Sequence, residues 1–524
     1  MLESVGNARP AEEVYLDGLE GLTLTGKGTR QMSPLQTISA SWIICDSWAG
    51  VAATVALAIA QGGPVTLTYG LVAMFILGGA CVLSLAELAS VYPTAGGQYH
   101  WTSILAPKHV SRALSYCCGL ANMFAWVAIC SGIAIIPPQL ILGIVVFYNP
   151  DYVPQQWHVF LIYQALNGVV MLYNATLLKK SLWFHDLCFF VTLASFFTIT
   201  IACVARTAPN YEPAESVWAT FHNSSGWSSG GVAFLTGLVS PNYMYAGIDG
   251  ALHLAEECQD AGRIVPRALI STLTIGFVTS FAFMVAMLYG TYDLEAVVTS
   301  PTGVPIYEMW RQAARSDVAA TVFIVLLVFA ATFALVGAQE TASRLTWSLA
   351  RDNSLVGSKW LGRMHPQLEV PVWALILNYS INFIIGCIYL GSSTAFSAFI
   401  GTGLILQHVS YAFPAALLVY RKRSKTWLPQ SRSFRLPGPV GYVVNVVTVC
   451  FAVLVLVFYD FPTVMPVQAS NMSGSHKNSF TALRLIEAPR LCMCRARCDG
   501  YIWRAELDDT CPQAIPWSAT PSRA

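Results

Sequence analysis

Apolar segments about as long as a bilayer is thick recur along this chain and constrain its fold more than any other feature. A helix needs roughly 20 apolar residues to cross a hydrocarbon core of about 30 Å. Eleven such stretches lie at 36–60, 65–92, 113–147, 157–178, 182–205, 230–257, 266–291, 318–350, 371–391, 393–420 and 438–460. The period-2 alternation of a membrane β-barrel is absent, and lipid accepts only helices or closed barrels. The sequence therefore predicts an all-α integral membrane protein with about eleven spans.

The composition supports this prediction and argues against other classes of protein. Hydrophobic residues make up 55% of the chain and charged residues 11%, whereas a soluble protein usually carries about 25% charged residues. The net charge of +1 gives no indication of a nucleic-acid partner. No Ser-His-Asp order, phosphate-binding glycine loop or zinc-binding helix motif is present. We therefore expect no enzyme activity, no cofactor and no metal site.

Lysine and arginine orient the chain, because they concentrate in cytoplasmic loops. With the N-terminus in the cytoplasm, the cytoplasmic segments hold Arg9, Lys27, Arg30, Lys108, Arg112, Lys179, Lys180, Arg263, Arg267, Arg351, Lys359, Arg363, Arg421, Lys422, Arg423, Lys425, Arg432 and Arg435. The outer loops hold only Arg206, Arg311 and Arg315. This orientation places the glycosylation sequon at Asn223 in a long outer loop. We expect a multi-pass glycoprotein, located in the plasma membrane and surrounded by the lipid bilayer.

The chain divides into three parts: a cytoplasmic N-terminal segment at 1–35, a membrane domain at 36–472, and a tail at 473–524. The tail has no 20-residue apolar run and is rich in small and charged residues, so we expect it to be disordered. After eleven spans it would lie outside the cell.

The sixth apolar stretch carries polar and helix-breaking residues near its middle, in SPNYMYAGIDGALHLAEE (240–257). Pro241 lacks an N–H group, and Gly247 and Gly250 lower the helix propensity, so we expect the helix to break there. Lipid does not tolerate the freed backbone groups, which need a water-filled cavity or a bound solute. A packing kink is the alternative. We expect a methyl group at Gly247 to impair uptake less than a bulky side chain at Gly250 does.

A short internal similarity links this stretch to the first one. SWAGVAA (47–53) is similar to MYAGIDGA (244–251), and five spans separate the two copies. Because this number of spans is odd, the second copy crosses the membrane in the opposite direction to the first, as in the inverted repeats of many secondary transporters. The sequence thus predicts a solute site where two broken spans meet.

Several motifs, in order along the chain, resemble the amino acid/choline transporter family of the amino acid–polyamine–organocation superfamily. They are LAELASVYPTAGGQYHW (85–101), ATFHNSSGWSSGGVAFLTGL (219–238), GIDGALHLAEE (247–257), SRLTWSLARDN (343–353) and LGSSTAFSA (390–398). The resemblance implies the leucine-transporter-type fold of five plus five inverted spans, with spans 1 and 6 discontinuous around the substrate. The family normally has a twelfth span after residue 472, and it is missing here.

The resemblance implies a permease that moves a small nitrogenous solute, such as an amino acid, 4-aminobutyrate or choline, by alternating access. A non-transporting solute sensor and a non-functional truncated permease are the alternatives. Uptake could be coupled to protons or driven by the membrane potential.

The candidate substrate-binding residues lie at the two breaks and on span 3. They are Asp46, Ser47, Trp48, Ala49, Gly50, Asn122, Trp126, Tyr243, Tyr245, Ala246, Gly247 and Asp249. A carboxylate in the membrane is costly and usually functional. Asp46 beside the indole of Trp48 would suit an ammonium group, through charge and cation–π attraction. The alternative is that Asp46 caps the half-helix that follows it.

Four polar residues of span 6, Asp249, His253, Glu256 and Glu257, recur at i, i+4, i+7 and i+8 and so share one helix face. One hypothesis is a proton path, in which His253, Glu256 and Glu257 act in gating or coupling. The other is a structural stripe, with Glu256 or Glu257 near Arg263 or Arg267.

Two further charged features have mainly structural interpretations. Glu340 and Arg344 in span 8 are four residues apart and would neutralise each other. The basic loop RKRSKTWLPQSRSFR (421–435) would fix the topology or attract anionic lipid.

Overall fold

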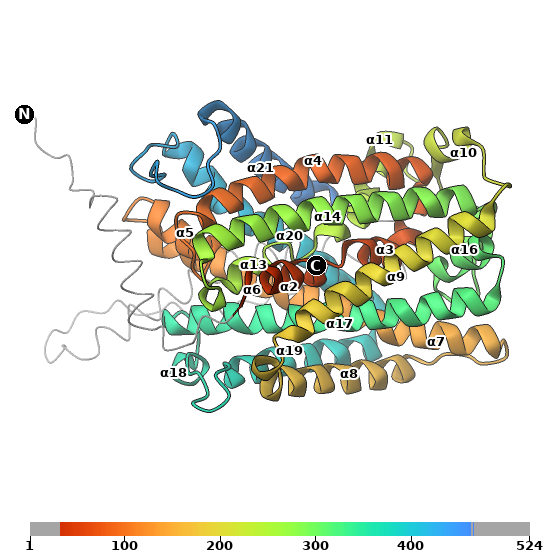
Figure 1. The fold of residues 1–524 in the computed structure, drawn as a ribbon, viewed down its shortest axis with the longest axis horizontal. Coiled ribbons are helices and arrows are strands. Elements are labelled where there is room, and N and C mark those ends of the chain that lie inside the picture. The colour runs from red at the N-terminus through yellow and green to blue at the C-terminus, as the bar shows by residue number, and fades with distance from the viewer. Residues whose placement is uncertain (1–31, 463–464, 466–524) are drawn as a thin grey trace, which may run out of the picture.

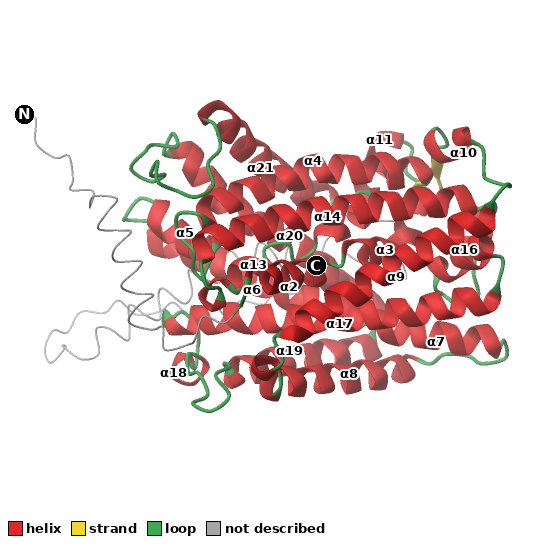
Figure 2. Ribbon diagram, viewed as in Figure 1, coloured by secondary structure: helices red, strands yellow, loops and turns green. Residues whose placement is uncertain are grey.

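The computed structural model describes residues 32–462 and residue 465. The expected N-terminal segment up to residue 31 and the expected tail at 473–524 lie outside the described residues, so the predictions for them stay open. Most of the described part is helical, with loops between the helices and one short pair of strands (Figure 2).

Ten helical segments among the described residues are long and apolar enough to cross a membrane. They are formed by α2 (Pro34–Cys45) with α3 (Ser47–Ala60), α4 (Pro64–Ala89), α6 (Ser111–Ala134) with α7 (Ile136–Tyr148), α8 (Gln156–Thr176), α9 (Trp183–Thr207), α14 (Ala261–Gly290), α17 (Asp317–Arg351), α19 (Val372–Gly391), α20 (Ser393–Tyr420) and α21 (Gly438–Phe458). The remaining expected span, the sixth at 230–257, is divided into α11 (Gly230–Gly237), α12 (Val239–Asn242), η2 (Tyr243–Tyr245), α13 (Gly250–His253) and η3 (Ala255–Glu257).

Short elements cover the two ends of the long helices (Figure 1). Figure 1 shows α5 (Gln98–Leu105) and α18 (Ser358–Leu361) at one end, and α10 (Ala214–Trp218) and α16 (Pro305–Ala314) at the other. The remaining short elements are η1 (Leu178–Lys180), α15 (Leu294–Val298), β1 (Gln61–Gly62) and β2 (His222–Asn223). The two strands pair antiparallel, with Gln61 opposite Asn223. This pairing joins the end of span 1 to the loop that leads into span 6.

Span 1 is interrupted at a single residue. Helix α2 begins at Pro34, and Ser33 and Gln36 form a capping box at its N-terminus. Asp46 then takes a left-handed conformation, with φ 36° and ψ 58°, between the end of α2 and the start of α3. A left-handed residue other than glycine costs roughly 1 kcal/mol or more, so the surrounding packing must hold this break in place.

Span 6 is interrupted over several residues, as its sequence predicts. The helix gives way to a 3₁₀ turn at Tyr243–Tyr245, and Ala246 is extended. Gly247 follows with φ +79°, a conformation that favours glycine. Helix resumes only at Gly250.

The two broken spans lie together at the centre of the helix bundle (Figure 1). α2 packs against α9, α14 and α17, whereas α3 contacts α12 and η2 of span 6. Trp42, Trp48 and Trp126 are fully buried in this region. The fold therefore brings both sets of freed backbone groups to one place inside the protein.

Candidate functional site

A cavity of about 310 Å³ lies against the breaks of spans 1 and 6. Span 1 contributes Asp46, Ala49 and Gly50, and span 6 contributes Tyr243 and Ala246. These five lining residues are all among the candidates from the sequence. Helices α6, α7, α17, α19 and α20 supply the remaining walls, which are mostly apolar.

Asp46 is the one acidic side chain among the described residues that line this cavity. Its side chain is only 2% exposed, and neither carboxylate oxygen has a hydrogen-bond partner in the described part of the chain. It stands at the N-cap position of α3 but makes no side-chain capping bond, which removes the support for the capping hypothesis. No lysine, arginine or histidine is among the described lining residues. The cavity thus holds an uncompensated acidic group.

The neighbours of Asp46 on α3 point elsewhere. Trp48 is fully buried and packs against Phe283, with the ring centroids 5.4 Å apart, and is absent from the described residues that line the cavity. Ser47 packs against Gly276 of α14 and also lies off the cavity. The aromatic lining comes instead from Tyr243, Tyr389 and Phe396.

Sequence reasoning missed the contributions of α7, α19 and α20 to the cavity. Gln139, Tyr389 and Phe396 line it, together with Ser393 and Ser397. Ser393 and Ser397 are four residues apart in an apolar span, and that spacing was the available signal for a polar helix face. No comparable pattern marks Gln139 or Tyr389.

A second polar site surrounds Asp249, which is fully buried. Its carboxylate accepts hydrogen bonds from Gln98 Nε2 at 2.7 Å, Tyr411 Oη at 2.9 Å, Gln407 Nε2 at 3.2 Å and Trp126 Nε1 at 3.3 Å. Asp249, Trp126 and Asn122 are therefore gathered here and not around the cavity. Gln98, Gln407 and Tyr411 were not anticipated from the sequence.

His253 completes this second site. Its Nδ1 lies 2.7 Å from the carbonyl oxygen of Ala95, and its Nε2 lies 3.2 Å from Asp249 Oδ2 and 3.3 Å from Asn122 Nδ2. The Asp249–His253 pair thus joins the break of span 6 to span 3 through Asn122.

The other two span 6 candidates lie off the cavity as well. Tyr245 is buried and donates its hydroxyl to the carbonyl of Leu273 at 2.9 Å. A Cβ atom on Gly247 would lie 3.0 Å from both Ile44 and Trp126. Gly247 therefore lets span 6 approach spans 1 and 3 closely.

Glu256 and Glu257 form ion pairs with partners that the sequence did not indicate. Arg351 binds Glu256 with two N–O contacts of 2.9 Å. Glu257 accepts from Lys179 and from Arg344, whose Nε lies 2.9 Å away. The expected pairing with Arg263 or Arg267 is wrong, since Arg263 instead approaches Asp260 at 3.8 Å on an exposed surface.

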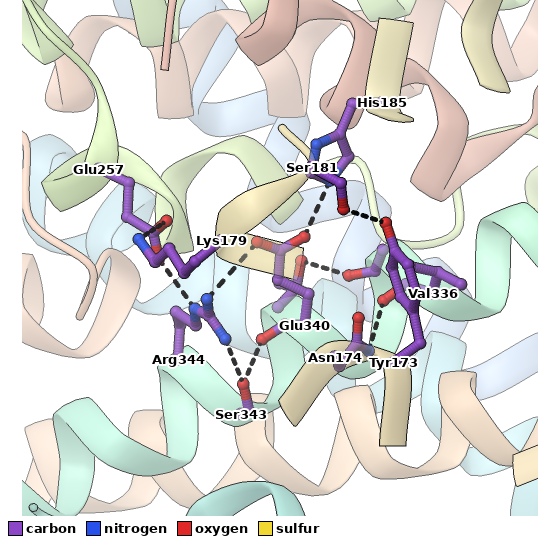
Figure 3. A network of polar contacts seen from close by, with 12 residues as sticks. Tyr173, Asn174, Lys179, Ser181, His185, Glu257, Val336, Glu340, Ser343 and Arg344 are labelled. Carbon is purple, nitrogen blue, oxygen red and sulfur yellow. Dashed lines mark hydrogen bonds and ion pairs between the residues drawn. The ribbon is translucent and has the colours of Figure 1, made fainter. Parts of the chain in front are cut away.

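The Glu257 pair extends into a wider charge network (Figure 3). Arg344 also lies 3.6 Å from Glu340, as the four-residue spacing predicts, and Glu340 lies 3.0 Å from His185 Nε2. Figure 3 shows Glu340 and Arg344 on one helix, with His185 and Glu257 reaching them from other parts of the chain. The network joins the C-terminal end of span 6 to α9 and α17, which is the arrangement that the structural hypothesis for this stripe expects.

Asn223 is exposed in β2. Its Oδ1 accepts from the hydroxyl of Ser225 at 2.6 Å, and its Nδ2 donates to the carbonyl of Trp227 at 2.8 Å. Asn223 is therefore on the surface, whereas Ser225 at the other end of the sequon is buried.

Comparisons with known proteins agree with this geometry. The family model described as amino acid permease matches residues 35–476. The choline transporter of Saccharomyces cerevisiae is 33% identical over 431 residues, which cover 82% of this chain and 75% of the yeast protein. The swainsonine transporter of Arthroderma benhamiae is 30% identical over 489 residues, which cover 90% of this chain and 95% of that protein.

A solved structure supports the fold. The crystal structure of the Eremococcus coleocola manganese transporter superimposes with a TM-score of 0.54 and covers 95% of this chain and 97% of its own. At 13% sequence identity this similarity concerns the fold alone. Together with the two breaks, it confirms the expected leucine-transporter-type arrangement.

Proposed function

Because this chain belongs to the amino acid permease family and is a multi-pass membrane transporter, we propose that its solute carries a cationic nitrogen group that binds Asp46. The observation that carries this proposal is the uncompensated acidic group in the central cavity. An ionised carboxylate buried without a partner is strongly unfavourable. A cationic solute supplies the missing charge when it binds.

The rest of the cavity wall favours a compact, singly charged cation over a zwitterion. Tyr243, Tyr389 and Phe396 line the cavity, and aromatic faces attract ammonium groups. A zwitterion would also need a partner for its carboxylate, and no basic side chain is among the described lining residues. Choline, the solute in the name of the yeast relative, fits this chemistry better than 4-aminobutyrate or a neutral amino acid.

The size of the cavity agrees with a small solute. About 310 Å³ is at the low end of the roughly 300–1,000 Å³ typical of ligand pockets. The site also lies between two discontinuous spans, where many secondary transporters bind their substrates.

Uptake of labelled choline, 4-aminobutyrate and a neutral amino acid into cells, with surface expression measured in parallel, tests the proposal. We expect saturable choline uptake that the other two solutes compete with poorly. Asp46→Asn keeps the side-chain size and removes the charge. It should raise the KM for choline by roughly 10- to 100-fold, as expected for loss of a charge-assisted contact of about 1.5–3 kcal/mol.

The matched control is Glu369→Gln, because Glu369 is an exposed acidic residue on a loop. It should leave the KM unchanged. Absence of choline uptake in the unmodified protein would reject choline as the solute. Binding of choline without uptake would instead indicate a sensor.

The coupling ion is proposed to be a proton held by Asp249 and His253. A carbonyl oxygen only accepts, so the 2.7 Å contact with Ala95 requires a proton on His253 Nδ1. The contact of Nε2 with Asp249 at 3.2 Å is then a hydrogen bond only when a second proton lies between them. When that proton leaves, the amide of Asn122, 3.3 Å from Nε2, can donate to the ring instead.

This exchange of partners would link proton binding to the packing of spans 3 and 6. Asp249 keeps its contacts with Gln98, Gln407 and Tyr411 in both states. Only the hydrogen bond that His253 makes through Nε2 changes. In the protonated state His253 bonds Asp249 within span 6. In the deprotonated state it bonds Asn122 of span 3 instead.

A further inference from the structure

The loop between α20 and α21 gathers positive charge around one buried carboxylate. Glu87 of α4 is fully buried. Arg423 Nη2 lies 2.6 Å from it and Arg432 Nη2 lies 2.9 Å from it. Two guanidinium groups thus share one negative charge, which leaves one positive charge without compensation.

Arg423 keeps unused hydrogen-bond donors. Its side chain is 6% exposed, and its Nε and Nη1 atoms are buried without a partner among the described residues. Gly441 at the start of α21 makes room for this guanidinium, since a Cβ atom there would overlap it. Buried charged donors without an acceptor are rare in proteins, because leaving them unpaired costs free energy.

Arg423 is also one of the residues that line a second hollow of about 370 Å³. Five basic side chains line it: Lys422, Arg423, Lys425, Arg432 and Arg435. No acidic side chain is among the described lining residues. Lys422, Lys425 and Arg435 form no ion pair within the described part of the chain. The ion pairs with Glu87 therefore neutralise only part of the positive charge that lines this hollow.

We propose that this basic pocket, formed by residues 422–442, binds a phosphate-bearing anion. The pocket lies between the end of α20 at Tyr420 and the start of α21 at Gly438, so it adjoins the ends of two membrane spans. The charge distribution puts this end on the cytoplasmic side. There the anion is either the head group of an anionic lipid or a soluble phosphate compound.

Bound anion would hold three helices together. Arg423 and Arg432 reach α4 through Glu87, and Arg423 contacts α21 at Gly441. α21 also packs directly against α4 and α20. Neutralising the pocket should therefore stabilise this part of the bundle independently of the solute cavity.

The test uses the purified full chain in nanodiscs and measures the thermal unfolding midpoint. One arm adds inorganic phosphate to phosphatidylcholine nanodiscs, against sodium chloride at equal ionic strength. The other compares phosphatidylcholine nanodiscs with nanodiscs that also contain phosphatidylinositol phosphate. We expect stabilisation in at least one arm, and the arm that responds identifies the source of the anion.

The variant is Lys425→Gln with Arg435→Gln, because both side chains are exposed and leave the Glu87 pairs intact. It should raise the half-maximal anion concentration by roughly fivefold for each removed charge. The control is Lys359→Gln with Arg363→Gln, an equal charge change on another exposed segment of the same predicted side. The proposal would be overturned if the anion stabilised the protein in neither arm, or if the variant and the control lost this stabilisation equally.

Discussion

Asp46 and Asp249 both lie buried at the breaks of spans 1 and 6, but within the described part of the chain only the Asp249 carboxylate has hydrogen-bond partners. Asp249 is surrounded by five polar side chains: Gln98, Trp126, His253, Gln407 and Tyr411. Asp46 has none among the described residues and faces the cavity. This difference supports the proposal that Asp46 is a site for an external cation, whereas Asp249 is the centre of an internal network.

This contrast predicts opposite effects on stability. Asp46→Asn removes a buried carboxyl that has no hydrogen-bond partner among the described residues and should stabilise the solute-free protein, on the order of 1–3 kcal/mol. Asp249→Asn removes an acceptor for several donors and should destabilise it, by about 2–4 kcal/mol. Thermal unfolding in detergent without solute measures both. Equal destabilisation by the two substitutions would mean that Asp46 has a structural partner.

His253→Gln tests the proposed proton site. It removes the group that gains and loses the proton and retains an amide that can reach Asn122 or Asp249. Uptake driven by a pH gradient should fall at least tenfold, whereas exchange of labelled for unlabelled solute should persist. In the unmodified protein, uptake should rise as the external pH falls. Gradient-driven uptake that survives the substitution would exclude His253 as the coupling group.

Gly247→Ala should be strongly disruptive, although the sequence led us to expect it to be milder than a bulky side chain at Gly250. Gly247 has φ +79°, and a Cβ atom there would lie 3.0 Å from Ile44 and Trp126. Left-handed backbone alone costs roughly 1–2 kcal/mol for alanine, and the contacts add to this. Gly391→Ala is the control, because nothing lies within 4 Å of the added atom. Unfolding midpoints should fall for the first substitution and stay constant for the second.

Glu257→Gln should destabilise the protein much more than Arg263→Gln. Arg344 is 3% exposed and pairs with Glu257 at 2.9 Å, so the substitution weakens the compensation of a buried charge. Breaking such a pair costs about 3–5 kcal/mol. Arg263 is 68% exposed in its pair with Asp260, and exposed pairs contribute about 0–1 kcal/mol. Similar effects of the two substitutions would contradict a bracing role for the network.

Asn223 should carry an N-linked glycan when the protein is made in a eukaryotic secretory pathway. The residue is exposed in β2, and the hydroxyl of Ser225 bonds its side chain at 2.6 Å. Asn223→Gln and Ser225→Ala should both abolish the mobility shift that endoglycosidase produces in the unmodified protein. No shift in the unmodified protein would exclude the glycan.

The sequence determined the spans and the break of span 6 because both depend on local properties, whereas packing holds the left-handed Asp46 at the break of span 1. Lipid requires each backbone polar group to be satisfied within its own helix, so the length of an apolar run defines a span. Pro241 and Gly247 interrupt span 6 by their own backbone chemistry. Five of the candidate residues line the cavity, namely Asp46, Ala49, Gly50, Tyr243 and Ala246. They stand at the breaks themselves, where position along the chain already indicates a site.

Only the tertiary structure decided which side chains face the cavity and which pair with one another. Trp48 lies only two residues after Asp46 in the sequence, yet its ring packs against Phe283. Tyr389 and Phe396 from distant spans line the cavity instead. Likewise, Glu257 pairs with Arg344 and not with the nearer Arg263. The rotation of each helix about its axis is fixed by packing against several neighbours at once, which no local pattern contains.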